Sequence, residues 1–169
     1  MPTTSMWLNT GKLRLVFLFS MIAALWLQLI ELPDLLAAAR PLWLPLIIAY
    51  WALTEPRAPV LLGAFCFGLF ADVLFSDVLG QQALGLVLLA YVVSRLRSIF
   101  ILFPLWQSTL ALVPAWLGFI FLMFWIDGIS NHHGDDWLRW MPLLSTSLFW
   151  PLVYAVMELL RTRGRSDED

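Results

Sequence analysis

The sequence predicts an all-α integral membrane protein, built as a six-helix transmembrane bundle. Of its 169 residues, 61% are hydrophobic and 13% are charged, against roughly 45–50% and ~25% in soluble domains. The mean hydropathy is +0.82, and a soluble protein of this size could not bury so much apolar surface. The sparse charges divide the chain into six apolar runs, comparable to the ~20 residues that cross a bilayer.

The first three predicted spans cover residues 13–32, 36–54 and 58–76. A basic start, an apolar run and the small residues 37–39 resemble a signal peptide. We nevertheless expect an uncleaved first helix, because acidic residues and proline intervene and five further apolar runs follow. The second run is short, and a re-entrant segment there would leave five spans. The third carries Asp72, the one acid placed inside a span.

The last three predicted spans cover residues 78–95, 99–126 and 139–158. The uncharged run 98–126 has 29 residues and would form a helix of ~43 Å, longer than the ~30 Å hydrocarbon core. Because Pro104 and Pro114 lie inside it, we expect a kinked, tilted helix with an interfacial lead-in at 99–103. Residues 1–160 thus form a single transmembrane domain, and residues 161–169 form a cytoplasmic tail.

The basic residues predict the orientation of the bundle. Six spans place both termini on one side, and lysine and arginine concentrate on the cytoplasmic side. With the termini inside, only Arg40 and Arg139 face outward, and eight basic residues face the cytoplasm: Lys12, Arg14, Arg57, Arg95, Arg97, Arg161, Arg163 and Arg165. Both termini are therefore expected in the cytoplasm. Five tryptophans near span ends fit lipid anchors at the interfaces: Trp7, Trp43, Trp125, Trp137 and Trp140.

Small residues and one acid share a face of the third span. Ala64, Gly68 and Asp72 are spaced four apart, with Gly63 beside them, and small residues let neighbouring helices approach closely. We expect Asp72 to point into the bundle or a partner, as a helix cap or an interhelical hydrogen bond. A proton or cation relay is the alternative, but it would need several aligned acids. On the structural interpretation, Asp72→Asn should be mild, because an amide still accepts one hydrogen bond.

Two further sets of polar residues are candidate sites. Gln107 on the fifth span shares a face with small residues, which indicates a helix–helix hydrogen bond. The predicted outer loop holds His132 and His133, followed by Asp135 and Asp136. Adjacent histidines rarely bind one ion together, so we expect a solvated loop rather than a metal site.

Composition and motifs exclude several functional classes. The net charge of −2 lacks the basic excess that nucleic-acid binding requires. The single cysteine, Cys66, excludes a disulfide framework and a cysteine-based metal cluster. The sequence has no P-loop, no GxGxxG, no HExxH and no paired-carboxylate motif. We therefore expect neither an enzyme nor a bound cofactor.

Several short motifs, in this order, resemble one family. Arg40-Pro41 opens the second span, Gly63-x4-Gly68-x3-Asp72 occupies the third, and Leu79-Gly80 follows the next short loop. Ala90-Tyr91 and Trp150-Pro151 continue the series. Together with the length and the order of apolar runs, these motifs resemble the rod shape-determining protein MreD family of bacterial inner-membrane proteins.

The resemblance implies a non-catalytic member of the machinery that elongates the cell wall. It implies association with MreC, a single-span periplasmic scaffold, and through it with a RodA-type glycosyltransferase, a penicillin-binding transpeptidase and, indirectly, the MreB filament. It also implies a fold similar to the substrate-binding component of vitamin transporters. The matching residues are then structural or partner-facing: Arg40, Pro41, Gly63, Gly68, Asp72 and Gly80. A small-molecule-binding component of a transporter stays open as the alternative, with Gln81, Gln82, Asp72 and the loop histidines as its polar candidates.

Overall fold

The computed structural model describes residues 4–30, 40–55, 58–75, 78–100, 105–129 and 140–166. Near the helix ends, residues 4–10, 12, 99–100, 105–106, 129 and 161–166 are described by their backbone alone. The described residues form six α-helices and no strand: α1 (Thr4–Leu29), α3 (Trp43–Thr54), α4 (Val60–Phe75), α5 (Gln81–Phe100), α6 (Leu105–Ile129) and α7 (Met141–Ser166). The predicted all-helical class is confirmed.

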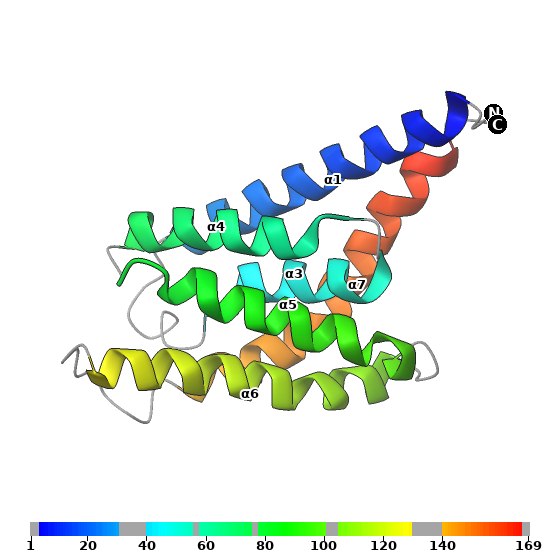
Figure 1. Cartoon of the computed structure of the whole chain (residues 1–169). Helices are drawn as coiled ribbons and strands as arrows, with labels where there is room; N and C mark the ends of the chain where they lie inside the picture. The colour runs from blue at the N-terminus through cyan, green and yellow to red at the C-terminus, as the bar shows by residue number, and fades with distance from the viewer. Residues whose placement is uncertain are drawn as a thin grey trace.

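Consecutive helices run in opposite directions (Figure 1). The start of α1 and the end of α7 lie at the same end of the bundle, which we call the terminal end. Helices α3 and α5 end, and α4 and α6 begin, at that same end, and the other helix ends lie at the opposite, distal end. Between α3 and α6 the helices are separated by only four or five residues, and such short connections favour antiparallel neighbours.

Helix α3 lies at the centre of the bundle. It packs against α1, α4, α5 and α7, and every residue from Leu44 to Leu53 is buried. A helix that is apolar all round is suited to such a position, because protein surrounds it on every side. Its 12 residues rise only ~18 Å, less than the ~30 Å of a bilayer's hydrocarbon core.

The lengths and exposed surfaces of the helices fit a membrane environment. Among the described helices, α6 and α7 are long and apolar enough to cross a bilayer, through Gln107–Gly128 and Met141–Leu160. Shorter apolar stretches occupy Leu13–Leu29, Trp43–Thr54 and Val60–Phe75. Large apolar side chains also face outward, and in water such a surface would be a liability.

Several helix boundaries differ from those expected from the charges. Helix α1 begins at Thr4 rather than at 13, α3 begins at Trp43 rather than at 36, and α7 runs to Ser166 rather than ending at 158. Helix α5 continues through Arg95 and Arg97 to Phe100, so the expectation that Ile99 and Phe100 lead into the next span is wrong. Arginine is a good helix former, and the Nη2 of Arg97 donates to the carbonyl of Thr54, 3.2 Å away. The charges therefore mark where the apolar run ends rather than where the helix ends. Pro114 lies inside α6 as expected.

A connected set of aromatic rings crosses the core. Phe17 of α1 meets Trp51 of α3 with ring centroids 5.4 Å apart. Tyr50, next along α3, meets Tyr154 of α7 at 5.6 Å. The series ends with the ring contacts Trp150–Tyr154 and Trp116–Trp150, which brings in α6. Such tilted and edge-on contacts suit the quadrupoles of aromatic rings, and here they tie four helices together.

Candidate functional site

Asp72 sits at the distal end of α4 and is buried, with 1% of its surface exposed. Its Oδ2 accepts the backbone N–H of Gly80 at 2.8 Å, and its Oδ1 accepts that of Gln82 at 2.7 Å. Helix α5 begins at Gln81, so these N–H groups belong to the first turn, where the helix offers no internal acceptor. A carboxylate also favours the positive end of the helix dipole. Asp72 thus caps the neighbouring helix α5.

Two glycines, Gly80 and Gly68, explain why α5 is capped by a side chain from another helix. The carbonyl of Gly80 accepts the first helical hydrogen bond, from Leu84, so Gly80 occupies the cap position yet has no side chain to fill it. Its φ of +93° is one that glycine adopts without strain. A methyl group on Gly68 would overlap the Cα of Ala83, so the backbones of α4 and α5 lie nearly in contact. Asp72, one turn further along α4, therefore reaches the start of α5.

The other small residues of this face pack against different helices. Ala64 is fully buried. A methyl group on Gly63 would overlap the ring of Phe17 on α1, so this glycine accommodates a side chain rather than a backbone. The small-residue face of α4 therefore contacts α5 near Gly68 and Asp72, and α1 near Gly63.

A second polar contact at the distal end joins α5 to α6. The Nε2 of Gln81 donates to the Oδ1 of Asp127 at 2.7 Å, and Gln81 is buried. In the sequence, Asp127 directly follows the fifth predicted span and Gln81 lies near the start of the fourth, and these positions alone do not predict that they pair. The sequence signal for this contact is a glutamine at the start of one helix and an aspartate at the end of the next, since the two helices are antiparallel.

The segment that opens α3 is held by two side chains. The N–H of Leu42 donates to the Oγ1 of Thr146 on α7 at 3.0 Å, and that of Leu44 donates to the Oε1 of Gln28 on α1 at 3.4 Å. Pro41 is buried. The Nε and Nη2 of Arg40 are buried without a hydrogen-bond partner in the described part of the chain. Arg40 and Pro41 thus lie at the distal end, next to a segment fixed to α1 and α7.

Gln107 lies away from these contacts. It is half-buried near the start of α6, at the terminal end of the bundle (Figure 1). The structure consequently brings Gly68, Asp72 and Gly80 together at one helix pair and leaves Gln107 apart. His132, His133, Asp135 and Asp136 lie outside the described residues.

Polar contacts within the core were not foreseen. The Nε1 of Trp51 donates to the Oγ of Ser20 at 2.9 Å, and that hydroxyl donates to the carbonyl of Phe17. The hydroxyl of Tyr50 donates to the Oε2 of Glu158 at 3.0 Å, and Glu158 is the final residue of the last predicted span. Trp51 lies three residues before the end of its predicted span, so its position did not separate it from tryptophans that anchor in the headgroup zone.

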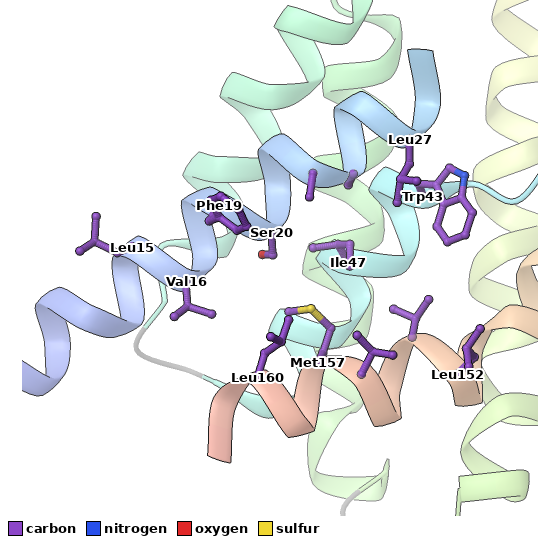
Figure 2. A pocket seen from close by; sticks show the side chains of 14 residues that line it. Leu15, Val16, Phe19, Ser20, Leu27, Trp43, Ile47, Leu152, Met157 and Leu160 are labelled. Atoms are coloured by element: carbon purple, nitrogen blue, oxygen red, sulfur yellow. The ribbon is translucent and has the colours of Figure 1, made fainter. Parts of the chain in front are cut away.

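Of the hollows that border the central helix, two bear on function. An apolar groove of about 610 Å³ lies between α1 and α7 with α3 beneath it, and Figure 2 shows its lining side chains. A cavity of about 250 Å³ lies at the distal end, with Gln28, Gln82 and Asp127 among its lining residues. Of the polar groups suggested for a transported ligand, Gln82 lines this cavity, and the carboxylate of Asp72 is engaged in the cap.

Comparison with known proteins gives a consistent family. The family model described as "rod shape-determining protein MreD" matches residues 10–160. A rod shape-determining protein MreD from Haemophilus influenzae is 28% identical over 145 residues, covering 84% of this chain and 88% of that protein. No solved structure matches the chain significantly. The expected similarity to the substrate-binding component of vitamin transporters therefore has no support.

Proposed function

The chain belongs to the MreD family of rod shape-determining proteins, and from this premise we propose that it is a non-catalytic membrane scaffold of the cell-wall elongation complex. In this role it binds an MreC-type periplasmic scaffold. Through that partner it connects to a RodA-type glycosyltransferase and a penicillin-binding transpeptidase, and indirectly to the MreB filament. Family membership itself assigns the chain to the membrane and to rod shape determination.

The use of the buried polar groups is the observation that supports a scaffold. Asp72 caps α5, Gln81 binds Asp127, and Tyr50 binds Glu158. Each of these bonds joins two helices, which is what polar side chains do when they fix a membrane bundle. Catalysis would instead need polar groups that converge on a space open to substrate.

Loss of this protein should therefore cost rod shape. Depleted cells should become round, and the periplasmic scaffold should no longer purify with the synthases from mild detergent. Both should return with a plasmid copy of the wild-type gene. If depleted cells kept their shape and the complex stayed intact, the scaffold role would be wrong.

A transport component is the second candidate, and the distal cavity is the observation that favours it. Its glutamines and Asp127 could bind a small polar molecule. Depletion would then lower the uptake of a nutrient while cells stayed rod-shaped. Measuring growth on limiting nutrients beside cell shape in the same depletion strain separates the two candidates.

The proposed orientation has six spans with both termini in the cytoplasm. A reporter that works only in the cytoplasm should be active when fused after Asp169 and inactive when inserted between Asn131 and Asp136. This follows from the excess of basic residues on the side of the termini. The opposite pair of results would invert the orientation, and activity at both positions would mean that the number of spans is wrong.

A further inference from the structure

We propose that the groove between α1, α3 and α7 binds one anionic phospholipid, with an acyl chain along α1 and the phosphate at the terminal end. This goes beyond the scaffold role, which assigns no lipid to the protein. The first supporting observation is the lining of the groove. It consists of aliphatic and aromatic side chains and one polar residue, Ser20, whose hydroxyl already accepts from Trp51 and donates to Phe17. With that hydroxyl engaged, the lining is suited to hydrocarbon.

The length of the groove favours an acyl chain over a partner helix. Its lining on α1 runs from Leu15 to Leu27, a rise of ~18 Å. The hydrocarbon layer of one leaflet is ~15 Å thick, half of the bilayer's hydrocarbon core. A membrane-spanning helix would need a surface about twice as long. Trp43, at the start of α3, lies beside Leu27 at the inner limit of the groove (Figure 2).

Basic residues adjoin the groove-lining segments of α1 and α7 in the sequence, on the side of the terminal end. Arg14 is exposed and directly precedes the first lining residue of α1. The last lining residue of α7, Leu160, directly precedes Arg161, and Arg163 and Arg165 follow on the last turns of the same helix. The start of α1 and the end of α7 both lie at the terminal end of the bundle (Figure 1). Basic residues next to a membrane surface attract anionic headgroups, so the occupant combines an acyl chain with a phosphate.

The test uses the full-length protein in nanodiscs made from equal parts of phosphatidylglycerol and phosphatidylcholine. The protein is then released into mild detergent, and retained lipid is measured by native mass spectrometry. The wild type should retain one phosphatidylglycerol at least tenfold more often than phosphatidylcholine. Val156→Trp, which fills the groove from its exposed position on α7, should lower total retention at least tenfold. The control Leu110→Trp, equally lipid-facing on α6, should retain lipid like the wild type.

A second pair of variants isolates the charge. Arg14→Gln combined with Arg161→Gln should abolish the preference for phosphatidylglycerol, whereas Arg95→Gln, an exposed arginine on α5, should leave it unchanged. Equal retention of both lipids by the wild type would overturn the proposal. So would retention that Val156→Trp does not alter. If Val156→Trp released the periplasmic scaffold partner while lipid retention stayed normal, a partner helix would be the occupant instead. If the double arginine variant lost its preference for phosphatidylglycerol but still assembled a complete elongation complex, the lipid site would be supported. The scaffold role would then stand independently of it.

Discussion

Replacing Gly68 with leucine should prevent the protein from accumulating in its folded form, the largest effect expected of any substitution at the predicted sites. Even the methyl group of Gly68→Ala would overlap the backbone of Ala83, and a backbone cannot rotate away as a side chain can. Overpacking costs ~1–3 kcal/mol where neighbours can adjust, and we expect Gly68→Ala to reach about 3 kcal/mol. Leucine would separate α4 from α5 and detach Asp72 from the helix start that it caps.

Two glycines provide matched controls for this prediction. Gly118 on α6 has open space where a side chain would extend, so Gly118→Ala should be neutral or slightly stabilising, because alanine favours helix. Gly63→Ala should be intermediate, because the Phe17 ring can turn aside. The stability of the three alanine variants is measured by thermal denaturation in detergent, together with the amount of each protein inserted in the membrane. A Gly68→Ala protein as stable as Gly118→Ala would show that α4 and α5 do not pack closely there.

Replacing Asp72 with leucine should cost about 4 kcal/mol of folding free energy. The substitution leaves two part-buried N–H groups, of Gly80 and Gln82, without their carboxylate acceptor, at ~1–3 kcal/mol each. The contacts also revise the expectation that Asp72→Asn is mild. Both oxygens accept an N–H, so an asparagine must turn its own NH₂ toward one of these donors. We therefore expect a loss of about 2 kcal/mol for Asp72→Asn.

The order of these variants distinguishes a cap from a charge relay. Stability in detergent should fall from wild type through Asp72→Asn to Asp72→Leu, and rod shape in complemented cells should decline in parallel. Expression is matched by immunoblot so that shape is compared at equal protein levels. An Asp72→Asn protein of wild-type stability that nevertheless fails to restore rod shape would mean that the charge itself is needed, and the proton or ion relay would replace the cap.

The all-helical class followed from hydropathy and sparse charges because both reflect the cost of burying polar groups in a bilayer. The grouping of Ala64, Gly68 and Asp72 on one face likewise follows from helical periodicity. Periodicity identifies a face but not the helix opposite it. That Gly68 and Asp72 face α5 whereas Gly63 faces α1 depends on how the helices are arranged.

The central position of α3 was not predictable from composition for a related reason. In a membrane protein, a lipid-facing helix and a fully enclosed one are both uniformly apolar, so hydropathy does not separate them. Trp51, Trp116 and Trp150, all deeply buried, show the same ambiguity: tryptophan suits both the headgroup zone and a packed core. Their ring contacts emerge only from the three-dimensional arrangement.

The cap on α5 has a consequence for how the chain enters the bilayer. Asp72 and its two N–H donors are only eight and ten residues apart in sequence, so the contact needs nothing beyond α4, α5 and their short connection. A carboxylate that had to enter hydrocarbon alone would face a large desolvation penalty. Held by the N–H groups, it has exchanged its water for protein donors before α6 and α7 have been synthesised. The two helices can then insert as one hairpin during translation, around which the later helices assemble.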